Sequence, residues 1–181
     1  MRNIIGISGV PGTGKTTLMW KFIDQYNWIE TEPVKLVPAL YNEELDLYIL
    51  GKYEKGEVFA GTDRLSMACQ PAAVEFISNT TSNILFEGDR LTNFKFFDFL
   101  LSLKETSVDF LVLTTKKNLL KERYDFRGSN QSEKFLKGRN TKIDNILSNF
   151  EYMDYTEVFP NDTFEDQKVI LEFIETKMSK Q

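Results

Sequence analysis

The sequence predicts an α/β protein with three layers, in which helices cover both faces of a five-stranded parallel sheet. Short apolar runs alternate along the chain with amphipathic helical segments, which is typical of this class. A glycine-rich turn directly follows the first apolar run, residues 3–8. The 181 residues are 41% hydrophobic, which suffices for one well-packed core, so we expect a single domain over residues 1–181.

The glycine-rich turn, residues 9–16, fits the pattern G-x-x-x-x-G-K-[ST] of a phosphate-binding loop. Its glycines allow backbone N–H groups to surround a phosphate, and the helix that begins near Gly14 adds its positive end. We expect Lys15 to reach the β- and γ-phosphates and the Thr16 hydroxyl to hold Mg²⁺. The alternative is a plain glycine turn before a helix that happens to carry a lysine. The residues expected to contact the nucleotide are Gly9, Gly12, Thr13, Gly14, Lys15, Thr16 and Thr17.

The chain beyond the first helix looks extended rather than helical. Residues 34–41 and 45–50 read as strands with a turn at 42–44 between them, so we predict a hairpin-like insertion over about residues 34–61. Pro38 favours an edge position for the first strand, because proline cannot donate a hydrogen bond to a neighbouring strand.

A strand at residues 83–86 ends in an acidic residue, Glu87, and a helix over residues 71–79 precedes it. In proteins with a phosphate-binding loop, the strand beside that loop usually ends in an acid that faces the metal. We therefore expect Glu87 to join Thr16 at Mg²⁺. The alternative is a solvated strand end without a role.

A helix over residues 93–103 is dense in phenylalanine, and a strand over residues 108–114 follows it. Such aromatic density is typical of a hydrophobic core, with a substrate groove as the alternative. The phenylalanines concerned are Phe94, Phe96, Phe97 and Phe99.

Residues 116–142 hold nine lysines and arginines against three acids, a local charge of +6 in a chain whose net charge is −5. We predict that this segment is a basic helical lid, because phosphoryl transfer needs cations around the γ-phosphate and exclusion of water. Arg123 and Arg127 lie four residues apart on one helical face and are the candidate clamp for that phosphate. The alternative is a solvated helix face, which we adopt for Lys116, Lys117, Lys121 and Lys142.

The chain closes with a strand at residues 156–159 and a final helix. Thr163 and Asp166 resemble a capping box at the start of that helix. The turn at residues 160–162 is a candidate contact for an adenine base.

The composition excludes several other functions. The chain has no histidine, which excludes Ser-His triads, His-ligated zinc and imidazole bases, so carboxylates or the substrate must handle protons. The single cysteine, Cys69, is expected to be a small buried apolar residue.

The net charge argues against a generally basic nucleic-acid coat protein. Without a signal or a long apolar run, we expect a cytoplasmic protein with no membrane association, and no protein partner is evident.

The phosphate-binding loop, the acid-ended strand and the run Leu120-x-x-Arg123-x-x-x-Arg127 together resemble the small P-loop kinases of the nucleoside monophosphate kinase and polynucleotide kinase superfamily. Residues 86–90, Phe-Glu-Gly-Asp-Arg, resemble the Asp-Gly…Arg element with which adenylate-kinase-like enzymes hold the acceptor, with Glu in place of Asp. The resemblance covers the chain except residues 34–61. It implies a three-layer P-loop kinase fold that uses ATP and Mg²⁺.

The acceptor side offers two acid–arginine pairs, Asp63 with Arg64 and Asp89 with Arg90. An alcohol acceptor benefits from a carboxylate that orients it and accepts its proton, whereas a phosphate acceptor chiefly needs arginines. Asp63 resembles the base of polynucleotide kinases, so we expect a hydroxyl acceptor with Asp63 as its base. A helix N-cap is the alternative role of Asp63, and Asp89 is the alternative base. The residues expected to bind the acceptor are Asp63, Arg64, Glu87, Asp89 and Arg90.

Residues 61–67 together with residues 86–90 are most similar to phage-encoded kinases that phosphorylate 5-hydroxymethyluracil in DNA. This resemblance implies transfer of the γ-phosphate of ATP to a hydroxyl of a nucleotide or modified-DNA acceptor, in the host cytoplasm if the gene is carried by a phage. Exposed aromatics such as Tyr48 or Tyr53 could hold a flipped-out nucleotide. The alternatives within the same class are a nucleoside monophosphate kinase, a nucleoside kinase and a small-metabolite kinase, which differs only in what Asp63 and Arg90 contact.

A different class, a P-loop switch that hydrolyses nucleotide without an acceptor, also has a sequence signal. Residues 141–144, Thr-Lys-Ile-Asp, match the [NT]-K-x-D signature of GTPases. They lie within a charged predicted helix rather than after an apolar strand, and no D-x-x-G follows the acid-ended strand. The setting therefore favours a kinase over a switch.

Overall fold

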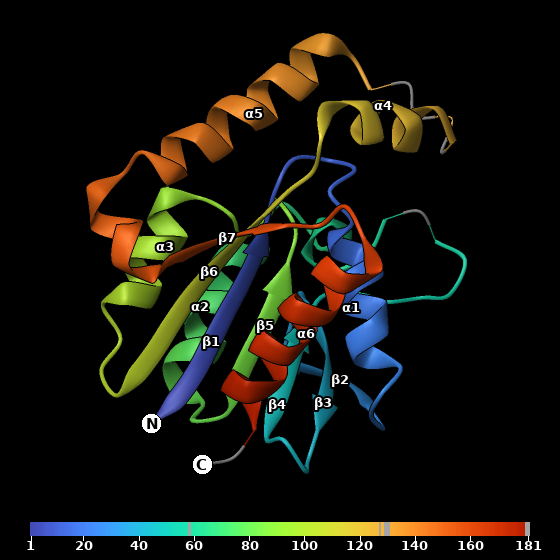
Figure 1. Ribbon diagram of the computed structural model, residues 1–181. Coiled ribbons are helices and arrows are strands. Elements are labelled where there is room, and N and C mark those ends of the chain that lie inside the picture. Colours follow the sequence, from blue (N-terminus) through green and yellow to red (C-terminus); the bar gives the residue numbers. More distant parts are fainter. Residues whose placement is uncertain (58, 127, 129–130, 180–181) are drawn as a thin grey trace.

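The computed structural model describes every residue except 58, 127, 129–130 and 180–181. Within this part of the chain, one sheet of seven strands forms the centre of the molecule, in the order β2-β3-β4-β5-β1-β6-β7 (Figure 1). The five strands from β4 to β7 in that order run parallel, whereas β2, β3 and β4 are joined by antiparallel pairing. The strands are β1 (Arg2–Ser8), β2 (Ile29–Val34), β3 (Val37–Asn42), β4 (Leu47–Leu50), β5 (Asn83–Glu87), β6 (Thr106–Thr114) and β7 (Thr156–Pro160).

The expected sheet of five strands is therefore wrong in its strand number, although the three-layer α/β class holds. The predicted hairpin does form, because β3 and β4 pair with Tyr41 opposite Tyr48. Its second strand, however, also pairs parallel with β5, so the hairpin extends the sheet instead of lying beside it. Beyond the first strand of the hairpin the sheet gains a further strand, β2, which pairs with β3 and which the sequence did not predict.

Pro38 lies in an interior strand, contrary to the expected edge position. The pairing of β2 with β3 shifts register between Thr31 and Val34, opposite the part of β3 that contains Pro38. A bulge tolerates a proline because the ladder is already interrupted there. Strand β2 forms this edge of the sheet instead, and its residues Glu30, Glu32 and Pro33 discourage pairing with a further strand.

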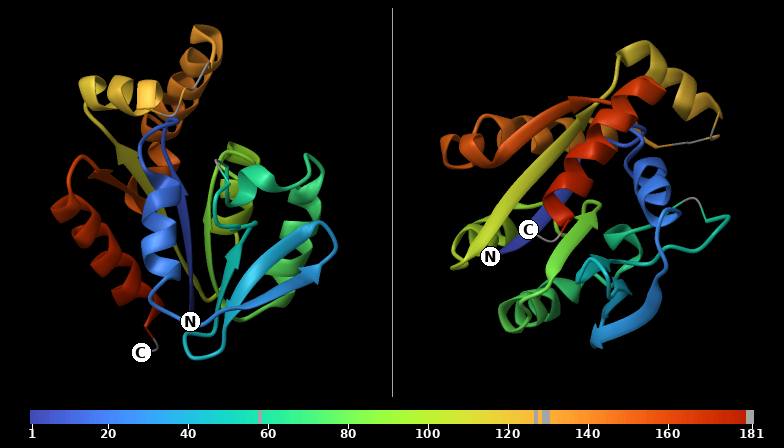
Figure 2. Two further views of the ribbon diagram at one scale, coloured as in Figure 1. Left: turned by 90° about the vertical axis from the view of Figure 1, so that its right-hand side faces the viewer. Right: turned by 60° about the horizontal axis from the view of Figure 1, so that its bottom comes forward.

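Helices cover both faces of the sheet (Figure 2). Ile5 and Ile7 of β1 face a core formed with α1 and α6, whereas Ile4 faces a core formed with α2 and α3. This alternation of side chains is what a strand buried on both faces requires. The helices are α1 (Lys15–Ile23), η1 (Thr62–Arg64), α2 (Cys69–Asn79), α3 (Phe94–Leu101), α4 (Lys117–Phe126), α5 (Glu133–Leu147), η2 (Phe150–Tyr155) and α6 (Phe164–Met178).

The phenylalanines of α3 contribute mainly to the core. Phe96 and Phe97 are fully buried, and the ring of Phe97 stacks on Phe110 with 3.8 Å between centroids. Phe94 is 44% exposed and stays outside this core. Cys69 is buried, as expected.

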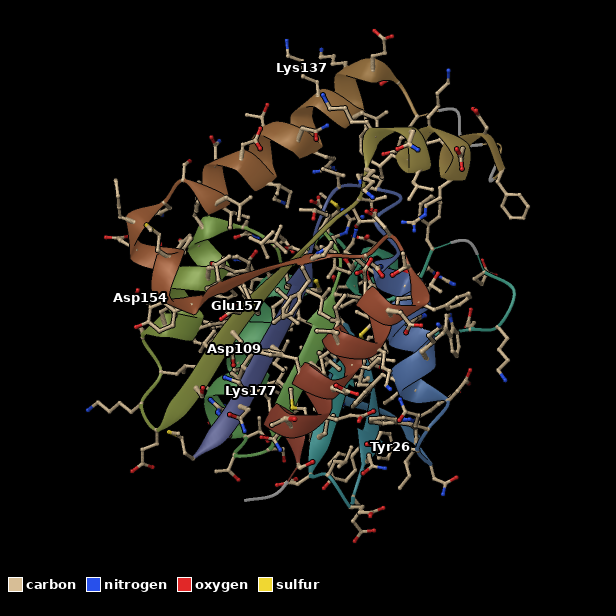
Figure 3. The ribbon with its side chains drawn as sticks, in the orientation of Figure 1. Tyr26, Asp109, Lys137, Asp154, Glu157 and Lys177 are labelled. Carbon is tan, nitrogen blue, oxygen red and sulfur yellow. The ribbon has the colours of Figure 1, made fainter. Side chains whose placement is uncertain are left out.

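The last helix is tied down at both ends. The predicted capping box forms, since the Thr163 hydroxyl accepts from the Asp166 backbone N–H and the Asp166 carboxylate accepts from that of Thr163. Near its other end, Lys177 points toward Asp109 of β6, with Nζ 2.8 Å from Oδ1 (Figure 3). Among the described residues, no helix is long and apolar enough to cross a membrane.

Candidate active site

The phosphate-binding loop connects β1 to α1 at the end of the sheet toward which the parallel strands point (Figure 1). Its backbone depends on glycine, because Gly14 has φ 85° and an added Cβ would lie 2.6 Å from the Asn161 amide nitrogen. The Lys15 ammonium donates to the carbonyl oxygens of Gly9, at 2.8 Å, and Val10, at 3.3 Å. The loop therefore folds as the motif predicted, with the lysine curled back over it.

Thr16 and Glu87 meet although 71 residues separate them, because β1 and β5 are parallel neighbours with Ile7 opposite Glu87. The Thr16 hydroxyl donates to Glu87 Oε1 at 2.9 Å. A hydroxyl and a carboxylate at the mouth of a phosphate-binding loop fit Mg²⁺, which binds to one or two protein oxygens together with substrate phosphates. The donor set expected from the sequence is thus brought together.

Glu87 is almost completely buried, at 1% exposed, and burial raises the pKa of its carboxyl to about 7. The Lys15 ammonium and the Thr16 hydrogen bond lower this pKa, but by less than burial raises it. The nearby Asp63 carboxylate adds a smaller increase. The carboxyl therefore sits near the midpoint of its titration at neutral pH, where a cation can readily displace its proton.

Asp63 lies on the same wall as Glu87. It belongs to the short helix η1, whose start is held in place because the Thr62 hydroxyl donates to the Glu87 carbonyl oxygen at 2.8 Å. The Asp63 Oδ1 atom accepts from the Asp89 backbone N–H at 2.7 Å. The side chains of Asp63, Glu87 and Lys15 all line one cavity of about 710 Å³ beside the phosphate-binding loop.

The two predicted arginines of the acceptor side behave differently. Arg90 lines the cavity, and its Nε donates to the Leu65 carbonyl oxygen at 3.2 Å. Arg64 does not line it, because its guanidinium pairs with Glu54 at 3.0 Å and Glu57 at 3.7 Å in the preceding loop. Arg64 stays a predicted acceptor ligand without support from this arrangement.

Asp89 pairs with two cations of α5 that the sequence did not assign to it. Arg139 lies 2.6 Å from its Oδ2 and Lys142 lies 2.7 Å from its Oδ1. The assignment of Lys142 to the solvated face is therefore wrong. The signal that was available is helical spacing, because Lys142 lies beside the buried residues Ile143 and Ile146 on the inner face of α5.

Arg123 of α4 hydrogen-bonds to the backbone of the phosphate-binding loop and of the turn at residues 160–162. It donates to the Gly12 carbonyl oxygen at 2.9 Å and to the Asn161 carbonyl oxygen at 2.9 Å. Beside it, the Tyr124 hydroxyl donates to the Pro11 carbonyl oxygen at 2.6 Å, a contact that the sequence did not indicate. Arg127, the second half of the expected clamp, lies outside the described residues.

A second, smaller cavity of about 420 Å³ is lined in part by Arg123. Gly14, Thr17, Phe126 and Gln167 contribute to its lining. The turn at residues 160–162 is linked to this cavity through Arg123, which lines the cavity and donates to the Asn161 carbonyl oxygen at 2.9 Å. The pocket adjoins the phosphate-binding loop at Gly14 and the first turn of α1 at Thr17, next to the position expected for the phosphates.

The tyrosines expected to be exposed are not. Tyr53 is only 7% exposed, and its ring packs edge-on against Trp20. The ring of Tyr48 in β4 packs against the rings of Tyr41 in β3 and Phe76 in α2. Likewise, the GTPase-like run at residues 141–144 lies inside α5 and does not form a base-reading loop.

A parallel α/β sheet with this loop, lysine, hydroxyl and acid defines the class of P-loop nucleotide-binding proteins. A family model described as P-loop Nucleotide Kinase3 matches residues 1–159, most of the chain, so the protein belongs to this family and is a kinase. Comparison with curated proteins finds no match. Among solved structures, a gluconokinase from Sinorhizobium meliloti 1021 is similar, with 14% sequence identity and a TM-score of 0.48 over 98% of this chain and 99% of that chain.

Proposed function

We propose that this kinase transfers the γ-phosphate of ATP to a hydroxyl of a nucleotide-type acceptor, with 5-hydroxymethyluracil in DNA as the best candidate. The observation that carries the proposal is the placement of the Asp63 carboxylate in the same cavity as Lys15 and Glu87. A carboxylate beside the phosphate-binding loop can orient an alcohol and remove its proton, which a phosphate acceptor does not require.

The nucleotide would bind with its phosphates in the loop formed by residues 9–16. Lys15 would turn from the loop carbonyls toward the β- and γ-phosphates, where its charge offsets the negative charge of the transition state. Thr16 and Glu87 would hold Mg²⁺, which supplies charge neutralisation on the phosphate oxygens when it is bound. The nucleobase would occupy the smaller cavity next to Arg123 and Gln167.

In the transfer step, the acceptor oxygen forms a bond to the γ-phosphorus while the bond from that phosphorus to the β–γ bridging oxygen breaks. ADP leaves, and the proton of the acceptor hydroxyl passes to Asp63. Asp89 is less suited to this role, because Arg139 and Lys142 already neutralise its carboxylate. The backbone N–H of Asp89 instead orients the general base Asp63, by donating to its Oδ1 atom.

A nucleoside monophosphate kinase is the second candidate, and the cations of α5 favour it. Arg90 and Arg139 line the cavity, and Arg139 could leave Asp89 to bind an acceptor phosphate. A nucleoside kinase shares the nucleotide site and differs only in what Asp63 and Arg90 contact. For any of these we propose a cytoplasmic enzyme, which would act in the host cytoplasm if a phage carries the gene.

The test is transfer of labelled γ-phosphate from ATP and Mg²⁺ to a parallel set of acceptors: nucleoside monophosphates, free nucleosides, plain DNA, and DNA that contains hydroxymethylated pyrimidines. Label in the modified DNA alone supports the proposal. Label in a nucleoside diphosphate supports the second candidate and gives Arg90 and Arg139 the role of phosphate ligands. Transfer to none of these acceptors, with ATP bound, contradicts the proposal.

A further inference from the structure

Two exposed phenylalanines line the large cavity, and neither belongs to the hydrophobic core. Phe59 is 59% exposed and Phe135 is 39% exposed. Phe59 lies in the loop that follows β4, whereas Phe135 lies in the first turn of α5, which passes above the C-terminal ends of the parallel strands (Figure 1). Two segments that are distant in the sequence therefore each present an aromatic ring to one cavity.

The backbone at both positions is anchored, so the exposure of these rings does not come from loose chain ends. The loop that carries Phe59 is closed by a bridge in which the Gly61 N–H donates to the Lys52 carbonyl oxygen at 2.8 Å. The Phe135 N–H donates to the Ser132 hydroxyl, which caps α5. Both rings thus lie at the cavity on segments whose backbone is hydrogen-bonded close by, and a large part of their apolar surface faces solvent.

The surroundings of the two phenylalanine rings suit a ligand that has a planar ring with a polar substituent. The same cavity contains charged residues close to the phosphate-binding loop, among them Lys15, Asp63 and Glu87. Aromatic side walls above a polar end are the usual features of a site that binds a flat heterocycle and reacts at one substituent. An acyclic sugar alcohol would leave both phenylalanine rings in water and would gain nothing from them.

Two further residues of the same cavity add to this match. The Arg139 guanidinium lies over the Phe135 ring, 4.6 Å from its centroid, and holds that ring in place from one side. The Gln131 Oε1 atom is buried and finds no hydrogen-bond partner among the described residues. Its amide would pair with the carbonyl and N–H groups on the edge of a pyrimidine ring once the side chain turns toward the cavity that the residue lines.

We infer that Phe59 and Phe135 form an aromatic clamp that stacks on the base of the acceptor and so selects acceptors in which the hydroxyl is borne by a nucleobase. This inference rests on the proposed function, because it concerns the acceptor side of the same site. It assigns binding of the acceptor base to residues that are not part of the transfer chemistry. Loss of the clamp should therefore weaken binding of the acceptor without weakening binding of ATP.

Binding can be measured without turnover, by using the intact protein saturated with a non-hydrolysable ATP analogue and Mg²⁺. The probe is a short single-stranded oligonucleotide with one 5-hydroxymethyluracil, compared with an oligonucleotide that is abasic at that position. The variants are Phe59→Ala and Phe135→Ala. Phe150→Ala is the matched control, because Phe150 is 86% exposed and does not line the cavity.

We expect each clamp variant to bind the base-bearing oligonucleotide about tenfold more weakly than the wild type, which corresponds to the loss of one stacking contact. Binding of the abasic oligonucleotide and of the ATP analogue should not change, and Phe150→Ala should behave as the wild type. Phe59→Tyr and Phe135→Tyr should restore binding, because a phenol stacks as a benzene ring does.

Equal affinity of the wild type for both oligonucleotides, or none for either, overturns the clamp, as does unchanged binding in both alanine variants. Failure of the proposed function has a different signature. If the clamp binds the base but no phosphate is transferred to it, the assignment of Asp63 and the hydroxyl is wrong and the clamp stands. If phosphate reaches a hydroxyl acceptor at the same rate without the phenylalanines, the clamp is wrong and the kinase assignment stands.

Discussion

The nucleotide side and the acceptor side of the cavity are built in opposite ways. The nucleotide side depends on residues 9–17, where loop, lysine and helix start are adjacent in the sequence, and one partner from β5, Glu87. The acceptor side combines three segments, around Asp63, Asp89 and Arg139, which meet only in the folded protein. The first arrangement can be recognised from a short motif, and the second requires the tertiary structure.

The two sides also differ in how their charges are satisfied. On the nucleotide side, Lys15 donates to two neighbouring loop carbonyl oxygens, and its charge also lowers the pKa of the Glu87 carboxyl. On the acceptor side, Arg139 and Lys142 are held by the Asp89 carboxylate. A ligand there must either avoid these pairs or replace them, which makes this side the more selective of the two.

The largest expected effect tests the nucleotide side. Lys15→Ala should lower phosphate transfer about a thousandfold or more, because it removes the cation nearest the γ-phosphate. Transfer of labelled phosphate measures this, with circular dichroism to show that the variant is folded. Lys137→Ala is the control, since Lys137 points outward from α5 and should leave transfer unchanged (Figure 3). A Lys15 variant with normal transfer would remove the loop from the mechanism.

The next effect tests the acceptor side. Asp63→Asn should lower transfer by about two orders of magnitude or more, since an amide cannot accept the proton of the hydroxyl. The amide oxygen can still accept from the Asp89 N–H, so the fold and the affinity for ATP should be preserved. Single-turnover transfer and equilibrium binding of ATP separate the two effects. If transfer stays near normal, Asp63 is a structural residue, although not the helix N-cap of the alternative interpretation, because Gly61 occupies that position of η1.

The sequence predicted the nucleotide side because each of its signals is local. The apolar runs of β1, β5 and β6 are buried on both faces and stand out in the sequence, whereas β2 was missed because its acids and proline resemble a loop. On the acceptor side, the pairing of Arg139 with Asp89 spans fifty residues and has no sequence pattern. The burial of Tyr53 was missed for the same reason, since its partner Trp20 lies on another element.

Glu87 belongs to both sides, and its titration should appear in the stability of the protein. The pKa is about 7 in the folded protein and 4.5 in an ordinary glutamic acid, so the folded state keeps a proton that the unfolded state releases. Without divalent ions, stability should therefore fall as pH rises from about 4.5 to about 7, by up to about 3 kcal/mol. Above that range the loss from this group is complete.

Urea unfolding at pH 5 and pH 8 with a chelator measures this change. Glu87→Gln should abolish most of the difference and should be more stable than the wild type at pH 8, because the amide buries no charge. Glu75→Gln, on the exposed surface of α2, is the control and should keep the wild-type slope. A wild type that is equally stable at both pH values would contradict the raised pKa.

The smallest expected effect concerns the pairing of Asp89 with α5. The side chains of Asp89, Arg139 and Lys142 are 31%, 32% and 25% exposed, so solvent screens their attraction. A double-mutant cycle of Asp89→Asn and Arg139→Ala should give a coupling free energy of about 1 kcal/mol or less, and high salt should reduce it. A stronger, salt-independent coupling would mean that α5 is fixed to the sheet. Weak coupling instead leaves α5 able to separate from Asp89 when an acceptor enters, so the side of the cavity that is harder to read from the sequence would also be the side that adapts to its ligand.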